Sequence, residues 1–236
     1  MRFADLRLDV HWVNVSLARA GLVTMHSGNA SGIDRESGMM IIKPSGVDYE
    51  KLRPEDMVVL RLDGILPSCR EVPDGIQSSL RPSVDHSHHL GLYRADPVLG
   101  GVVHTHSSFA TAWAVHERPI PCALTAIADE FGGDIPCAPY ADNQDESIVR
   151  SILANRTRGP AVLLGRHGVF TFAASPRAAF KAAVMVEDVA RTLLLAHSLG
   201  EISCLHAKEI DKWWERYHST YGQEPEPGMP IRATKA

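Results

Sequence analysis

Residues 102–107 read Val-Val-His-Thr-His-Ser, and this stretch decides what the rest of the chain is expected to form. The apolar residues from Val98 onward predict a strand that ends at Thr105. Side chains two residues apart on a strand point to the same face, so His104 and His106 direct two imidazoles at one point. Imidazole nitrogens suit a borderline cation such as zinc. Two histidines alone leave the alternative of a pair that is only solvated or hydrogen bonded.

Two other segments offer further metal ligands. His167 follows the apolar run 161–164 within Gly-Arg-His-Gly, where a strand of an α/β sheet delivers functional residues to a crevice. Asp85 follows Arg-Pro-Ser-Val at 81–84, and its carboxylate could offset the charge that three neutral imidazoles leave on a divalent ion. Taken singly, residues of this kind are more often structural than functional.

Histidine is unusually frequent, with 12 in 236 residues. The densest group, His86, His88 and His89, is expected to lie behind the ligand Asp85 or on the surface.

Two glycine-containing segments are candidate anion-binding turns, namely Ser-Gly-Asn-Ala-Ser at 27–31 and Lys-Pro-Ser-Gly at 43–46. Small residues let backbone N–H groups approach a ligand, and the hydroxyls and Lys43 can bind phosphate oxygens. Neither segment matches a P-loop or a dinucleotide fingerprint, so nucleotide binding is not indicated. Each could also be a simple reverse turn.

Hydrophobic spacing predicts the remaining elements. Helices are expected at 3–20, from Ser107 or Ser108 to 115, at 142–155, 176–199 and 208–219; strands at 39–42, 58–60, 98–105 and 161–164; and a long loop at 63–83. Interleaved helices and strands predict one layered α/β domain over residues 1–223. The proline-rich tail 224–236 is expected to be flexible.

Composition excludes several classes of partner. The 24 basic and 28 acidic residues give a net charge of −4, which disfavours binding to nucleic acid or to an anionic membrane. No apolar run is long enough to span a bilayer, and the amino terminus lacks the apolar core of a secretory signal, so a cytoplasmic protein is expected. Four scattered cysteines without a Cys-x-x-Cys pair indicate neither a zinc knuckle nor a disulfide framework.

Taken in order, these segments resemble the class II aldolase and adducin family, and specifically its L-ribulose-5-phosphate 4-epimerase branch. The resemblance runs from Leu6 to Gln223. Its motifs are Ser-Gly-Asn-Ala-Ser at 27–31, Lys-Pro-Ser-Gly-Val-Asp-Tyr at 43–49, Pro-Ser-Val-Asp at 82–85, Val-Val-His-Thr-His-Ser at 102–107, Ala-Asp-Glu-Phe at 128–131, Ile-Pro-Cys at 135–137, His-Gly at 167–168 and Tyr-Gly-Gln at 221–223.

The resemblance implies a three-layer α/β/α fold with a mixed, mostly antiparallel central sheet. It implies one divalent metal per subunit, most often Zn²⁺ with Mn²⁺ or Co²⁺ as alternatives, and a homotetramer whose active sites lie at subunit interfaces. The implied metal ligands are His104, His106, His167 and Asp85. The implied phosphosugar-binding residues are Gly28, Asn29, Ser45, Gly46, Ser83 and Val84.

Three residues favour the epimerase branch. Asp85 stands where fuculose-phosphate aldolases carry a glutamate, while Asp129 and Tyr221 match the acid/base residues of the epimerases. Such an enzyme inverts C4 of a ketopentose phosphate by breaking and re-forming the C3–C4 bond, with Asp129 and Tyr221 sharing the roles of acid and base in an order left open. Tyr221 is expected to reach a neighbour's site, and its alternative role is packing on the core.

The chain departs from the family pattern at three places, one of which is a carboxyl-terminal Lys-His-Tyr stretch that is not matched in register, so neither His206 nor His218 is given a role. The phosphate segment usually reads Ser-Ser, but here it is Ser83-Val84, so one hydroxyl is missing. The loop before it is long. The alternatives are therefore a class II phosphosugar aldolase or a related lyase or decarboxylase, and more remotely a non-catalytic adducin-like module, which predicts lost ligands that this chain retains.

Overall fold

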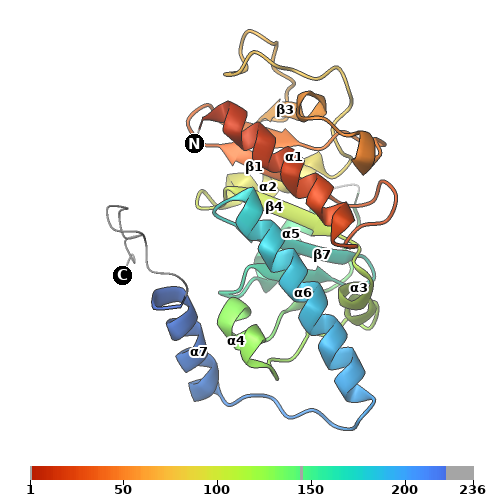
Figure 1. Ribbon diagram of the computed structural model, residues 1–236, viewed down its shortest axis with the longest axis vertical. Helices are drawn as coiled ribbons and strands as arrows, with labels where there is room; N and C mark the ends of the chain where they lie inside the picture. Colours follow the sequence, from red (N-terminus) through yellow and green to blue (C-terminus); the bar gives the residue numbers. More distant parts are fainter. Residues whose placement is uncertain (1, 144–145, 222–236) are drawn as a thin grey trace.

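The computed structural model describes residues 2–143 and 146–221 (Figure 1). Its strands are β1 (Asn29–Asp34), β2 (Met39–Ile42), β3 (Val58–Arg61), β4 (Gly101–Thr105), β5 (Cys137–Ala138), β6 (Ala161–Leu164) and β7 (Gly168–Ala173). Its helices are α1 (Phe3–Arg19), α2 (His86–Ala95), α3 (Ser108–Val115), α4 (Thr125–Phe131), α5 (Ser147–Asn155), α6 (Pro176–His197) and α7 (Ala207–Ser219), with short 3-10 turns η1 (Tyr49–Lys51) and η2 (Pro54–Asp56).

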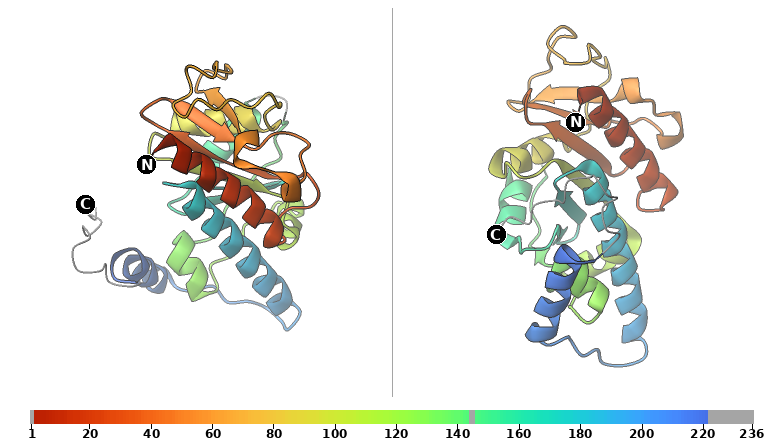
Figure 2. Two further views of the ribbon diagram at one scale, coloured as in Figure 1. Left: turned by 45° about the horizontal axis from the view of Figure 1, so that its top comes forward. Right: turned by 60° about the vertical axis from the view of Figure 1, so that its left-hand side comes forward.

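The strands form one seven-stranded sheet in the order β3-β2-β1-β4-β7-β6-β5. Neighbouring strands are antiparallel except β5 and β6, which run parallel. Helices α1 and α6 lie side by side over one face, and α2 and α5 lie behind the other (Figures 1 and 2). The three-layer α/β/α fold with a mostly antiparallel sheet is therefore confirmed.

Both faces of the sheet are buried, which explains its continuous apolar strands. In β2, Met40 and Ile42 belong to the hydrophobic cluster that α2 and α5 cover. Ile41 between them points the other way, into the cluster beneath α1. Alternate side chains of a single strand thus join the sheet to both helical layers.

Most of the expected elements are present, and α6 begins as predicted, with the Ser175 hydroxyl accepting a hydrogen bond from the Ala178 N–H. Three boundaries were wrong. The expected turn at 27–31 becomes strand β1 from Asn29, because its backbone pairs with β4, and the strand expected from Val98 begins only at Gly101. The helix expected from residue 142 begins only at Ser147. The tail predicted from 224 lies outside the described residues.

The sequence did not predict α2, α4, β5 or β7. In α2 the buried face includes His88 and His89, so polar residues fill positions where an apolar periodicity would have been visible. The expected serine cap of α3 is also wrong. Ser107 occupies the cap position without a side-chain bond, and the carboxylate of Glu187 on α6 accepts the Phe109 and Ala110 N–H groups at 2.9 Å each.

Within the described ranges, no helix has the length and apolar character needed to cross a membrane.

The long loop at 63–83 is present as predicted and is fixed to α1 by a buried arginine. Arg7 is only 2% exposed, and its guanidinium donates to both oxygens of Asp74 at 2.7 and 3.0 Å and to the carbonyls of Met57 and Ile76. This anchor matters for the site because the loop ends at Ser83.

We expect Arg7→Ala to destabilise the protein by about 3 kcal/mol, because removing one partner of a buried ion pair leaves the other charge poorly compensated. Burial acts to raise the pKa of the Asp74 carboxyl, but hydrogen bonds from Arg7 and the Ile76 N–H hold that pKa below its usual value. The stabilisation is thus complete above the unfolded-state pKa of about 3.9 and is lost as the pH falls through the lower folded-state pKa.

Urea denaturation of both proteins at pH 7 and at pH 3 measures this difference. Arg2→Ala removes an exposed Arg–Asp pair at the start of the same helix and serves as the control, with no change in midpoint expected. Equal losses in the two variants would contradict the role of Arg7.

Candidate metal centre and anion pocket

Three histidines meet at the edge where β4 ends. His104 is on β4, His106 follows that strand, and His167 lies in the turn between β6 and β7. Their nitrogen ligand atoms all lie within 4.8 Å of one another, and the Nε2 atoms of His104 and His106 are 3.0 Å apart. The structure therefore brings together the three imidazoles that the sequence proposed as metal ligands.

The ring of His104 is held in one orientation. Its Nδ1 donates to the carbonyl of Val169 at 3.0 Å, and the ring stacks on Phe170 with centroids 4.3 Å apart. Because Nδ1 carries the proton, Nε2 keeps its lone pair for a cation.

Two unusual backbone positions bring the third ligand in. Arg166 has φ of +58°, a left-handed conformation that is uncommon outside glycine, in the turn that presents His167. At Gly168 an added Cβ would collide with the carbonyl of Thr105 and would lie 2.7 Å from the ring of His106. Only glycine allows this close approach of the two strands.

The donor set fits a divalent cation. Burial lowers the pKa of His104 to about 3, and burial also lowers the pKa of His106 and of His167, so all three are neutral ligands at pH 7. Nitrogens bound at about 2.0–2.1 Å in a tetrahedral zinc site lie roughly 3.4 Å apart. The observed 3.0 Å spacing needs little movement to accept such an ion.

Asp85, the fourth predicted ligand, does not join the group of nitrogens within 4.8 Å of one another. Its carboxylate accepts the amide N–H of Asn29 at 2.6 Å. Burial acts to raise the pKa of Asp85, but His104, His89 and the Asn29 bond together lower it below its usual value. The residue is thus ionised near the histidines, and its coordination to a metal stays a prediction.

A pocket of about 330 Å³ opens beside the histidines. All six residues predicted to bind the phosphosugar line it, namely Gly28, Asn29, Ser45, Gly46, Ser83 and Val84. Within the described ranges, the backbone N–H groups of Gly28, Gly46 and Val84 have no hydrogen-bond partner. Free N–H groups around a pocket are what an anion requires.

The buried ammonium of Lys43 adds positive charge to this pocket. Its side chain is 1% exposed, donates to the carbonyl of Pro44 at 3.2 Å and lies 4.6 Å from the ring centroid of Tyr49. Burial lowers the pKa of Lys43 to about 8, so the ammonium form still predominates at pH 7.

Tyr49 also holds the glycine segment in place. Its hydroxyl is within 2.9 Å of the carbonyls of Ser27 and Gly28. At Gly28, where φ is +74°, an added Cβ would lie 2.5 Å from Val23 and 2.9 Å from the carbonyl of His104. This glycine lets the anion pocket and the metal ligands share one wall.

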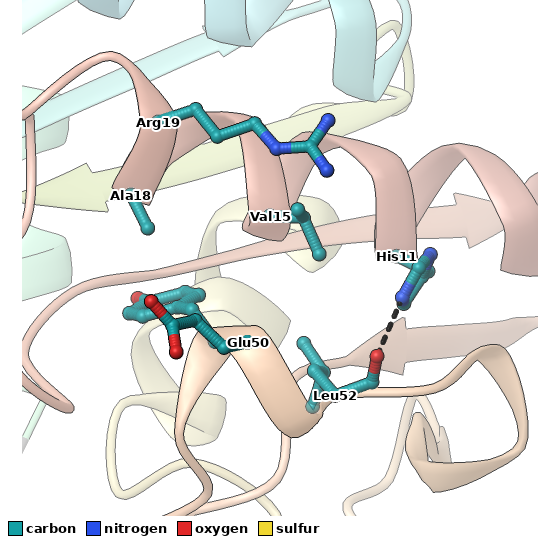
Figure 3. A pocket seen from close by; sticks show the side chains of 7 residues that line it. His11, Val15, Ala18, Arg19, Glu50 and Leu52 are labelled. Carbon is teal, nitrogen blue, oxygen red and sulfur yellow. Dashed lines mark hydrogen bonds between the residues drawn. The ribbon is translucent and has the colours of Figure 1, made fainter.

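The other side of Tyr49 faces a larger cavity of about 530 Å³ between α1 and η1 (Figure 3). His11 there is hydrogen bonded to the carbonyl of Leu52, and the side chain of Arg19 runs along α1. This cavity contains none of the clustered histidines, so its size does not make it the catalytic candidate.

The predicted acid/base residues lie outside the pocket of their own chain. Asp129 is on α4, and its Oδ1 is buried without a hydrogen-bond partner in the described residues. Tyr221 follows α7, is 63% exposed and stacks on Tyr217. Helices α4 and α7 pack against each other, so the two residues belong to one region of the molecule. One chain alone does not bring them to the histidines.

In the dense histidine group, His88 and His89 are buried and His86 is half-buried. His88 and His89 are 2% and 0% exposed, and His89 Nδ1 bonds to the hydroxyl of Ser31, which also bonds to Tyr93. His26 also lines the anion pocket, although the sequence reasoning did not select it. In the sequence, only its position next to the segment 27–31 indicated that His26 could line the pocket.

Comparison with known proteins agrees with this geometry. The family model for the class II aldolase and adducin N-terminal domain matches residues 9–194, and the chain therefore belongs to that family. The fold and site agree with this class: three histidines that could hold a metal ion lie at the edge of a mostly antiparallel sheet, beside a pocket lined by free backbone N–H groups.

Two solved structures are 26% identical to this chain. An L-fuculose 1-phosphate aldolase superposes with a TM-score of 0.79, covering 91% of this chain and 96% of its own. YgbL of Klebsiella pneumoniae, placed among aldolases, epimerases and decarboxylases, gives 0.75 with 90% and 99% covered. An L-fuculose-1-phosphate aldolase of Thermus thermophilus, 24% identical, shares the fold with a TM-score of 0.66 over 83% of this chain and 95% of its own. The family resemblance is confirmed, and the epimerase branch stays a prediction.

We expect His106→Asn to lose the bound divalent metal, because an amide nitrogen is a poor ligand and the remaining histidines hold the ion more weakly. Elemental analysis after dialysis measures the change, with about one ion per wild-type chain and at least tenfold lower occupancy in the variant. His116→Asn alters an exposed histidine outside the group and should keep the wild-type content. Full occupancy in both would show that the three histidines do not hold the metal.

Proposed function

We propose that this protein is a metal-dependent sugar-phosphate epimerase that inverts C4 of a ketopentose phosphate such as L-ribulose 5-phosphate. The observation that carries the proposal is the shared pocket, in which the group His104, His106 and His167 adjoins a cradle of free N–H groups and Lys43. The cradle suits a phosphate, and the histidines suit a cation, most often Zn²⁺ in this family, next to the sugar carbonyl.

The residues divide the chemistry between them. A divalent cation held by the three imidazoles supplies a Lewis acid toward a ketose carbonyl and its neighbouring hydroxyl. Asn29 and Asp85 are hydrogen bonded to each other beside the histidines, so they can orient the sugar hydroxyls. Gly28, Gly46, Ser45, Ser83 and the Val84 N–H hold the phosphate and keep the cleaved fragment in place.

Epimerisation needs a base and an acid on opposite sides of the C4 carbon. One of Asp129 and Tyr221 removes the proton of the C4 hydroxyl, the C3–C4 bond breaks, and its electron pair moves to the carbonyl. The aldehyde fragment turns and the same bond re-forms on its other face, with the second residue returning the proton. No net oxidation or loss of atoms occurs.

Asp129 and Tyr221 act, in this proposal, on the pocket of a second subunit of a homotetramer. The exposure of Tyr221 and the unpartnered Oδ1 of Asp129 support this arrangement. Within the described ranges, neither the Tyr221 hydroxyl nor Asp129 Oδ1 has a hydrogen-bond partner in its own chain.

A second candidate is an aldolase that releases its fragments. The specific observation in its favour is the similarity to an L-fuculose 1-phosphate aldolase at a TM-score of 0.79. Both reactions use the same bond cleavage, and they differ in whether the aldehyde fragment leaves.

Product analysis separates the two candidates. We expect the metal-loaded protein to convert L-ribulose 5-phosphate to D-xylulose 5-phosphate without net cleavage, as followed by NMR. Release of dihydroxyacetone phosphate from L-fuculose 1-phosphate, with no epimerisation of the pentose, would replace this proposal by the aldolase. Turnover of neither substrate by protein with full metal content would reject both substrates.

Mixing inactive variants tests the shared site. Asp129→Asn and His106→Asn should each lower kcat by at least about 100-fold, because one lacks the acid/base group and the other the metal. If sites are built from two subunits, refolding the two variants together forms hybrid sites that contain both intact groups, and activity returns. A mixture that stays as inactive as its components would place both residues in one subunit's site or outside catalysis.

A further inference from the structure

Residues 83 and 84 offer the pocket few side-chain hydrogen-bond donors. Val84 lines the pocket with an exposed side chain that cannot donate a hydrogen bond. The neighbouring Ser83 hydroxyl accepts the Asn29 amide N–H at 3.0 Å and keeps its own O–H to donate to a ligand. Residues 83 and 84 together thus provide one hydroxyl for a ligand.

A histidine on another wall of the same pocket supplies a donor of a different kind. His26 Nε2 lies 2.6 Å from Oδ1 of Asp48, and the second oxygen of that carboxylate accepts Lys51 Nζ at 2.7 Å. A carboxylate only accepts hydrogen bonds, so Nε2 carries a hydrogen. In the part of the chain that the structure describes, Nδ1 of His26 has no hydrogen-bond partner, and it can donate to a ligand in the imidazolium form, in which both ring nitrogens carry a hydrogen.

The turn that contains His26 is fixed by hydrogen bonds. Met25, the residue before it, has φ of +54°, in the left-handed region. The Ser27 N–H and hydroxyl both donate to the carbonyl of Thr24, and the Thr24 N–H donates back to the Ser27 hydroxyl. This closed turn sets the position of His26 next to Gly28, where the N–H is free.

The charges around His26 favour an anion at this point. Asp48 is shared by His26 and Lys51, and hydrogen bonds from Lys51 and His26 hold the pKa of its carboxyl below the usual value. With the imidazole protonated, His26, Lys51 and Asp48 sum to one positive charge. An arriving phosphate dianion stabilises the protonated imidazole and takes a charge-assisted hydrogen bond from it.

We propose that His26 is a specificity-determining residue that donates its Nδ1–H to the phosphate of the substrate and replaces the hydroxyl that Val84 does not provide. The proposal rests on the proposed function, because it requires a phosphorylated substrate. It makes the pocket selective for a phosphate over a neutral group, because an imidazolium donor makes a charge-assisted hydrogen bond to a phosphate dianion and not to a neutral group.

The test is a cycle of four proteins: wild type, His26→Ala, Val84→Ser and the double variant. Titration calorimetry with inorganic phosphate on metal-loaded protein measures the pocket without turnover. We expect His26→Ala to weaken phosphate binding about tenfold, as loss of a hydrogen bond to a charged group does. Val84→Ser should improve binding several-fold in the His26→Ala background and little in the wild type, because the two donors replace each other.

Matched measurements make the result specific. His116→Ala removes another exposed histidine away from this pocket and should bind phosphate as the wild type does. Unfolding temperatures within about two degrees of wild type show that the variants remain folded. With an active substrate, His26→Ala should raise KM about tenfold and leave kcat within about twofold, because the phosphate contact is made equally in the ground and transition states.

Two outcomes overturn the role of His26. One is phosphate binding by His26→Ala equal to that of the wild type. The other is an equal gain from Val84→Ser in both backgrounds, which would show that the two positions act independently. Failure of L-ribulose 5-phosphate to turn over while the phosphate cycle behaves as expected would instead reject the proposed reaction and leave the anion site in place.

Discussion

The antiparallel pairing of β4 with β7 is the constraint on which the site depends. It sets His104 opposite Phe170, stacks the two rings and points the Val169 carbonyl at His104 Nδ1. The same pairing brings the start of β7, and with it His167, to the end of β4. A register shift by one residue would turn His104 to the other face of the sheet and break up the group of three histidines. Gly168 makes the pairing sterically possible.

The anion pocket depends on a second pairing, that of β1 with β4. Asn29 lies opposite His104 in that register, so the pairing places the segment 27–31 next to the three histidines. Ser83, which also lines the pocket, comes from a segment that is distant in the sequence. Ser83 is held against Lys43 by backbone bonds, and the loop before it is tied to α1 through Arg7 and Asp74. The long loop therefore ends at a fixed point.

Polar groups in this protein are buried where they position the site. Asn29, Ser31, Lys43, His89 and His104 are all fully or almost fully buried. Burying such groups costs free energy unless they are hydrogen bonded, and most of them are. In the described residues the buried atoms without a partner include Asn29 Oδ1, His89 Nε2 and Asp129 Oδ1, and the proposed function gives roles to Asn29 and Asp129.

The sequence by itself determined the local elements and the chemistry of the ligands. Its apolar spacing predicted α1, α6, α7 and strands β2, β3 and β6, and the spacing of His104 and His106 predicted a pair on one strand face. It missed α2 because buried histidines hide the helical periodicity, and it misjudged the cap of α3 because Glu187 supplies that cap from 77 residues or more away. Only the tertiary structure decided that His167 joins the pair, that Val84 and His26 share one pocket, and that Asp129 and Tyr221 lie outside it. Hydrophobic periodicity indicates which way a side chain points within its own helix or strand. Contacts between distant segments depend instead on strand register and on packing between elements.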